Sequence, residues 1–372
     1  MAAKVLKRAL AGIVVLFATG TPSHAEVAFE WVTVGRPGNL PDPLNSGAVP
    51  GIGAVPYVYR IAKYEVTNAQ YVEFLNAVAT TDTNSLYHVW MASDSLRGGI
   101  ERTGSPGTYV YATKPNMGDK PVNLVTYINA MRFANWLHNG QPTGAQDVTT
   151  TEDGAYSIAD GFAEVRKPMA RFFIPSENEW YKAAYHQPQA DGGDVDDFWL
   201  YSTRSNSIPT IAQADAVGNI SNPGANVANY QFGAVWNGQG GHVTTVGSAG
   251  SLSDSYYGTA DQAGNLHEWN EALLLSGSCR GARGGAWAYA GTALSSSVQG
   301  CEHPSSFSSA LMRVGFRIAT VAENAGVPAV STWGLLVLLF GLLVAATCLL
   351  RRVKMRESTV TSWTDGFALW SR

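Results

Sequence analysis

The sequence predicts a loop-rich α+β domain with short strands and few helices, followed by one C-terminal transmembrane helix. The chain of 372 residues contains 39 Gly, 11 Trp and 16 Tyr, which is typical of irregular, aromatic-packed domains rather than of helical bundles. Three segments show helical periodicity between long stretches with little pattern. Near the C-terminus, Trp333–Leu350 carries no charge and is long enough to span a bilayer.

Residues 1–25 read as a secretory signal peptide. Lys4, Lys7 and Arg8 precede an apolar run, and Ser23-His24-Ala25 has the small-x-small pattern of a cleavage site. We therefore expect export, with residues 26–324 forming a domain outside the cytoplasm.

The C-terminal end predicts membrane attachment. The transmembrane helix at 333–350 is followed by the basic residues Arg351, Arg352, Lys354 and Arg356, which places the tail 351–372 in the cytoplasm. The linker 325–332 overlaps the stretch "VPAVSTWG", Val327–Gly334, which resembles the start of a PEP-CTERM/IPTL-type sorting signal. This resemblance implies a sorting protease as partner and a domain that is either anchored in the membrane or released to the cell surface.

Charge and cysteine content exclude several classes of function. A net charge of −4 offers no basic face, so nucleic acid is not an expected partner. The seven histidines lack the spacing of a transition-metal site. Cys348 lies in the transmembrane helix. In an oxidising compartment, Cys279 and Cys301 form either a disulfide or two unpaired buried thiols.

The first ordered elements are a strand and a helix. Alternation over Tyr57–Thr67 predicts the strand. Thr67 then serves as N-cap of a helix. Its apolar face is formed by Tyr71, Phe74, Leu75 and Val78.

Two further helices follow. One lies within Asn123–Gly140, with Gly140 as C-cap, and its apolar face is formed by Tyr127, Met131, Ala134 and Leu137. The next starts after Ser176, which forms a capping box with Glu179. Packing alone accounts for all three helices.

The stretch "DQAGNLHE", Asp261–Glu268, has the pattern of a calcium-binding turn. Asp261 and Glu268 supply anionic oxygens, and Gly264 lets the chain curl so that carbonyls face inward. It follows a long region, 191–258, that is rich in Gly, Asn, Ser and Tyr. A loop region of this length needs local interactions that pair its buried backbone polar groups, and a bound metal ion is one such interaction. The alternative is a solvated acidic loop.

Six motifs together resemble the formylglycine-generating enzyme (sulfatase-modifying factor) family. In order along Phe29–Ala322 they are "YEVTNAQYVEFLNAV", "PVNLVTYINAMRFANWL", "FFIPSENEWYKAAY", "DQAGNLHEWNE", "RGGAW" and "VGFRIA". The resemblance implies an irregular C-type-lectin-like variant of α+β fold, the sulfatase-modifying-factor fold, with structural calcium. The second family calcium site corresponds to Asp261, the carbonyls of Gln262, Gly264 and Leu266, and Glu268; the first corresponds to Asn229 and Tyr230, without a counterpart for its later Asp.

The resemblance also locates the position of the family's catalytic cysteine pair. Tyr289 and Leu294 stand there, so no catalytic residue is identified, and copper(I), which wants thiolates, is not expected. Arg313 stands where the family has an Asn. Trp287, Tyr289 and Arg313 are the candidate cleft residues.

Three functions follow from this. The first is a calcium-stabilised, non-catalytic binding or scaffold module for an unknown protein, peptide or glycan. The second is a divergent oxidoreductase of the sulfatase-modifying-factor and nonheme-iron superfamily. The third, true formylglycine generation, is disfavoured by Tyr289 and Leu294.

Overall fold

The computed structural model describes residues 26–45, 51–93, 97–303 and 312–322. The predicted signal peptide, sorting linker, transmembrane helix and cytoplasmic tail lie outside these residues. The described part belongs to one compact unit, which ends at Ala322. Within it, no helix is both long and apolar enough to cross a membrane.

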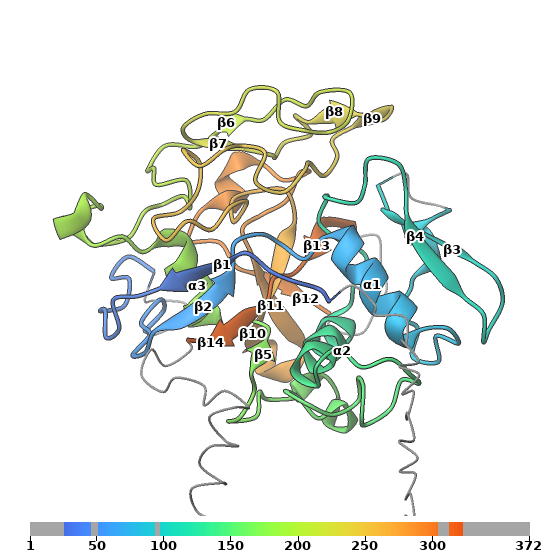
Figure 1. Ribbon diagram of the computed structural model, residues 1–372. Helices are drawn as coiled ribbons and strands as arrows, with labels where there is room; N and C mark the ends of the chain where they lie inside the picture. Colours follow the sequence, from blue (N-terminus) through green and yellow to red (C-terminus); the bar gives the residue numbers. More distant parts are fainter. Residues whose placement is uncertain (1–25, 46–50, 94–96, 304–311, 323–372) are drawn as a thin grey trace, which may run out of the picture. The chain divides into compact units, whose positions relative to one another are not determined.

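Two four-stranded sheets form the centre of the unit (Figure 1). The first is antiparallel, in the order β1 (Trp31–Val34), β2 (Tyr59–Ala62), β14 (Ala319–Val321) and β5 (Phe172–Phe173). The second has the order β12 (Gly300–Glu302), β11 (Cys279–Arg283), β10 (His267–Leu274) and β13 (Val314–Gly315). Strands β10 and β13 are parallel, so the stretch that begins at Val314 runs alongside His267 and Glu268.

The three predicted helices are present: α1 (Asn68–Val78), α2 (Tyr127–His138) and α3 (Glu177–Tyr185). Thr67 and Ser176 both make capping boxes, with Gln70 and Glu179, and the predicted apolar faces are buried. The end of α2 differs slightly from the prediction. Asn139 is the C-cap, and Gly140 follows it with φ of +85°, because the residue after the cap is the one that turns left-handed. Strand β2 is shorter than the alternating pattern over Tyr57–Thr67.

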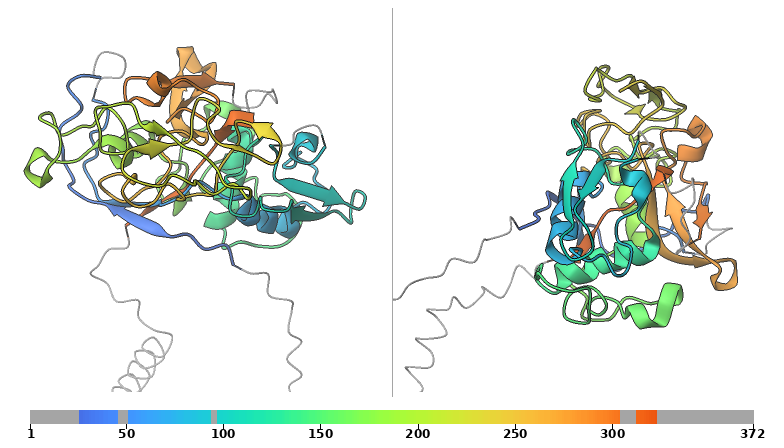
Figure 2. Two further views of the ribbon diagram at one scale, coloured as in Figure 1. Left: turned by 90° about the horizontal axis from the view of Figure 1, so that it is seen from above. Right: turned by 90° about the vertical axis from the view of Figure 1, so that its right-hand side faces the viewer.

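The remaining elements are short. Two hairpins and one parallel pair are formed by β3 (Ile100–Thr103) with β4 (Val110–Thr113), β8 (Val235–Trp236) with β9 (Gln239–Gly240), and β6 (Thr210–Ile211) with β7 (Val227–Ala228). Short 3-10 helices are η1 (Val89–Met91), η2 (Ile158–Ala163), η3 (Gln189–Asp191), η4 (Leu275–Gly277) and η5 (Gly291–Leu294). Figure 2 shows the β3–β4 hairpin projecting beside α1. The loop-rich region predicted at 191–258 is confirmed.

Aromatic side chains fill the main core. Tyr71, Phe74 and Phe133 pack α1 against α2, with ring centroids 5.3 to 5.9 Å apart. Phe133 also meets Phe316 at 5.4 Å, edge to face, which joins the helices to the segment between β13 and β14. Ring pairs in this geometry add to the free energy of area burial. The core therefore fixes the segment from which Arg313 and Arg317 extend.

Candidate functional site

The backbone of the Gly-Gly pair that follows β11, Gly284 and Gly285, passes close to two other segments of the chain, one at Gln262 and one at Leu294. Gly284 has φ of +93°, and a Cβ there would lie 2.8 Å from the carbonyl oxygen of Gln262. Gly285 has φ of +70°, and its Cβ would lie 2.8 Å from a methyl of Leu294. Only glycine accepts both the left-handed backbone and this contact. Just after the pair, the Trp287 amide donates to the Asn265 carbonyl at 2.9 Å, and Tyr289 lies against His267 of β10.

The structure brings the three predicted cleft residues together, and two others join them. Tyr289 lies edge-on to His267, with ring centroids 5.5 Å apart, and the Arg313 guanidinium lies 5.6 Å from the Tyr289 ring. The Arg97 guanidinium lies 4.5 Å from the Trp287 ring. We call these five residues the Arg313 cluster.

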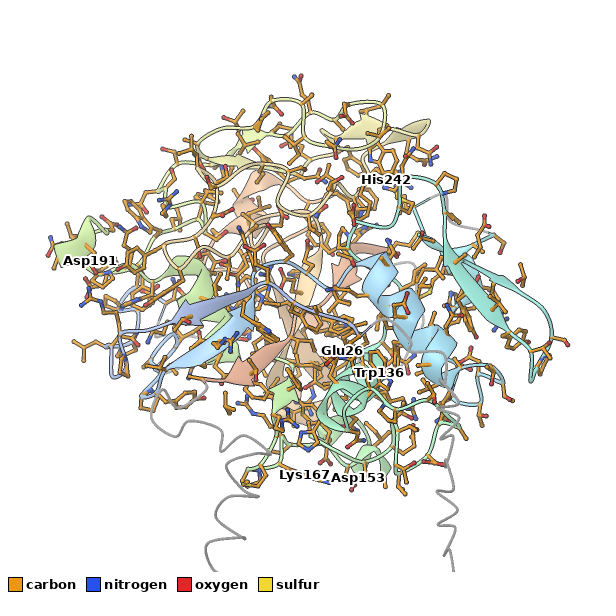
Figure 3. All side chains as sticks on the ribbon, in the orientation of Figure 1. Glu26, Trp136, Asp153, Lys167, Asp191 and His242 are labelled. Atoms are coloured by element: carbon orange, nitrogen blue, oxygen red, sulfur yellow. A yellow bond between two sulfur atoms is a disulfide. The ribbon has the colours of Figure 1, made fainter. Side chains whose placement is uncertain are left out.

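Arg97 is anchored to the last residue of β9 and to the residue that follows it. Its Nε donates to the Gly241 carbonyl at 2.8 Å and its Nη2 to the Gly240 carbonyl at 3.2 Å. The cluster thus lies at the end of the unit where Figure 3 labels His242, away from the Asp153–Lys167 ion pair. Phe232 extends the aromatic surface: it meets Trp287 edge to face at 5.7 Å and is half exposed.

His267 sits at the base of the Arg313 cluster. The ring is 4% exposed, and neither nitrogen has a hydrogen-bond partner among the described residues. Burial, and then the charge of Arg283, lowers the pKa of His267 to about 4. The imidazole is therefore neutral at physiological pH.

Leu294 has a purely structural environment. It is fully buried in an apolar cluster with Tyr201, Ala228, Tyr230 and Ala263. Its methyl group also closes the space over Gly285. An isobutyl group in this place offers neither a nucleophile nor a metal ligand.

The described chain matches the model of the sulfatase-modifying factor enzyme 1-like domain over residues 54–322. It belongs to this family. No curated protein matches the chain. The family match confirms the loop-rich fold expected from the six sequence motifs.

Three solved structures are similar to this family member. They are Treponema denticola variable protein 1 (18% identity, 82% of this chain and 99% of that chain, TM-score 0.46), CarF (19%, 80% and 99%, 0.49) and PvdO from Pseudomonas aeruginosa (16%, 72% and 82%, 0.38). At these identities and TM-scores, the neighbours say nothing about the activity of this chain.

The predicted second calcium site of the family contains a buried ion pair. The Glu268 carboxylate accepts from Arg317 Nη2 at 2.6 Å, from Arg317 Nε at 2.5 Å and from Trp180 Nε1 at 2.8 Å. Arg317 also donates to the carbonyls of Ala62, Lys63 and Ala260, and its side chain is fully buried. A carboxylate has about four lone-pair positions, so Glu268 retains about one.

Two more carboxylates face the same arginine. The Asp261 carboxylate accepts from the Gly247 amide at 2.5 Å, and burial raises the pKa of Asp261 to about 6. Glu65 accepts from the side chain of Asn265 and the amide of Leu266, each at 3.1 Å. Burial, and then the charges of Asp261 and Glu268, raises the pKa of Glu65 well above its usual range.

These residues fit calcium in part. When Glu65 and Asp261 are both ionised, three carboxylates around one arginine carry two negative charges in excess, and a divalent cation would neutralise these charges. Among the described residues, no group of three or more His, Cys, Asp or Glu side chains is arranged to hold a metal ion. A calcium ion here would depend on Asp261 and the predicted main-chain carbonyls, with Glu268 giving at most one oxygen.

The predicted first calcium site contains a hydrogen-bond acceptor that has no donor in the described part of the chain. Oδ1 of Asn229 is buried and has no hydrogen-bond partner in the described part of the chain, while Nδ2 donates to the His242 carbonyl at 2.7 Å. The neighbouring Tyr230 donates its hydroxyl to the Pro209 carbonyl at 2.6 Å. An enclosed amide oxygen of this kind fits a cation ligand, because an unpaired buried acceptor is costly.

The structure joins Cys279 to Cys301 in a disulfide between β11 and β12, with Cα atoms 5.5 Å apart. These are the only cysteines in the described part of the chain. The described residues therefore contain no free thiol, whether near Tyr289 or elsewhere.

A separate cavity of about 320 Å³ lies between η2, the start of α3 and the end of β10. Glu271 lines it, accepting from the Tyr156 hydroxyl at 2.6 Å and facing Arg166 at 3.4 Å. Burial is the main reason that the pKa of Glu271 rises to about 7. Its ionisation therefore costs folding free energy near neutral pH.

Sequence reasoning missed three residues of these sites. Arg97 precedes β3 and Glu65 follows β2, far from the motifs that they join. His267 lies inside the calcium-like stretch Asp261–Glu268, but a lone histidine has no spacing pattern that would indicate a role. Only the parallel pairing of β10 with β13 places His267 beside the segment of Arg313.

Proposed function

We propose that this family member is an exported, calcium-stabilised, non-catalytic binding module that holds its ligand at the Arg313 cluster. The observation that most strongly supports this proposal is the environment of Tyr289 and Leu294, the residues at the positions of the family's catalytic cysteines. One is an aromatic residue packed on His267, and the other is an apolar residue sealed in a small core. Neither can replace a thiolate as a copper(I) ligand.

The surface beside the cluster supports binding. Phe232 and Tyr289 remain partly exposed beside two arginines, and aromatic and arginine side chains dominate binding free energy at protein surfaces. Membrane anchoring at 333–350 and sorting at 325–332 belong to the same proposal. They would hold such a module outside the cell membrane.

Metal content tests the choice between this module and an oxidoreductase. We expect the purified full-length chain to contain calcium and no stoichiometric iron or copper by elemental analysis. We also expect no oxidised product from a cysteine-containing peptide under oxygen. Bound redox metal or an oxidised peptide would establish the oxidoreductase instead.

The calcium site needs a variant that leaves the Glu268–Arg317 ion pair intact. We expect Asp261→Asn to remove most of the rise in Tm that added calcium gives the wild type, in titrations that reach millimolar concentrations. Asp254→Asn is the matched control, because Asp254 is buried and lies outside the predicted ligands. An Asp261→Asn variant with the wild-type calcium response would rule out this site.

A further inference from the structure

The Arg313 guanidinium forms no ion pair with any described residue. It is half-buried, its Nε is enclosed without a hydrogen-bond partner, and no carboxylate of the described residues lies within 4 Å of it. Glu302 is near enough for its pKa to be lowered by Arg313 against the larger effect of burial, yet the two form no ion pair. Among the described residues, the aromatic ring that the Arg313 guanidinium meets is that of Tyr289.

A second guanidinium is placed beside the first. Burial, and then the charge of Arg313, lowers the pKa of Arg97, so the two cations repel each other. The fold nevertheless enforces their proximity. Nδ2 of Asn123, whose side chain is buried, donates to the Met312 carbonyl at 3.0 Å and to the Arg97 carbonyl at 3.4 Å. One amide thus ties together the two segments that carry the arginines.

Trp287 reinforces the arrangement from the other side. Its Nε1 donates to the Met312 carbonyl at 3.4 Å, while its ring lies under the Arg97 guanidinium. Neutral aromatic faces support a cation without neutralising it. Two like charges on such a platform are therefore stabilised together by a shared anion, and guanidinium groups are well suited to planar or tetrahedral oxyanions.

We propose that Arg313 and Arg97 form an oxyanion site, so that the ligand of this module carries a carboxylate, phosphate or sulfate group. The inference rests on the proposed function, because it names the chemistry of the ligand held at the Arg313 cluster. Tyr289 and Phe232 provide apolar surface for the part of the ligand next to the anion. Asn123 is a positioning residue for both arginines.

The test compares anionic aromatic probes with a neutral one. Benzoate, phenyl phosphate and phenyl sulfate are titrated against the full-length protein at constant ionic strength, with benzamide as the neutral isostere, by ligand-observed NMR. We expect at least one anion to bind tighter than benzamide. Arg313→Gln should weaken that binding by roughly tenfold or more, the loss for one charge-assisted hydrogen bond. The three probes distinguish the carboxylate, phosphate and sulfate alternatives.

Arg171→Gln is the matched control. It removes the same charge from an arginine that also lies over an aromatic ring, Phe172, at 5.7 Å, but away from the Arg313 cluster. Its anion binding should equal that of the wild type. Equal loss in both variants, or no anion preference in the wild type, would overturn the oxyanion site.

Tyr289→Ala separates this inference from the proposed function. If benzamide binds as well as the anions and Tyr289→Ala abolishes that binding, the binding module stands and the oxyanion site falls. If no probe binds and a wider panel of neutral glycans and peptides also fails, both fall together.

Discussion

Arg313 and Arg317 lie four residues apart in one segment and have opposite surroundings. Arg317 is fully buried, and its Nε, Nη1 and Nη2 all donate hydrogen bonds. Arg313 is half-buried, with an enclosed Nε that has no partner in the described part of the chain. Packing requires the first arrangement, because a buried charge must be paired. The second adds no such stability, and Arg313 is therefore the arginine that we propose for ligand binding.

The largest effect should come from Arg317. We expect Arg317→Met to destabilise the protein by about 3–5 kcal/mol, because it leaves the Glu268 carboxylate buried and uncompensated. Urea unfolding measures this. The double variant Arg317→Met/Glu268→Gln should recover part of the loss; if it is no more stable than the single variant, the ion pair is not the cause.

Glu271 should give a smaller, pH-dependent effect. Its folded-state pKa of about 7 exceeds the ordinary value of 4.5, so the protonated form is favoured by folding. Its contribution is fully present below about pH 4.5 and is lost as the pH rises through about 7. We expect Glu271→Gln to gain on the order of 2 kcal/mol relative to wild type between pH 5 and pH 8. Parallel stability curves for the two proteins across that range would contradict the assignment.

The smallest effect on stability should come from Arg313. Arg313→Gln removes a repulsion with Arg97 and breaks no ion pair of the described residues, so we expect a change within about 0.5 kcal/mol, or a slight gain. Thermal unfolding without added anions measures it. If Arg313→Gln lowers the free energy of unfolding as much as Arg317→Met does, Arg313 also stabilises the fold. The proposed difference in role between the two arginines would then be wrong.

Local sequence signals determined much of the fold. Thr67 and Ser176 begin their helices because a side-chain oxygen there pairs an otherwise unpaired backbone amide, a purely local effect. The six ordered motifs likewise determined the family. The spacing around the Gly-Gly pair identifies Tyr289 and Leu294 as the residues at the family's cysteine positions, but it does not reveal what they contact.

Only the tertiary structure decided which charges are paired. Glu268 and Arg317 are 49 residues apart, and Asn123 lies 189 residues from Met312, yet each pair is in direct contact. Spacing in the sequence predicted the Glu268 carboxylate as a calcium ligand but could not reveal its competing arginine. Contacts of this range depend on how the two sheets and the aromatic core bring distant segments together, and no local pattern of residues carries that information.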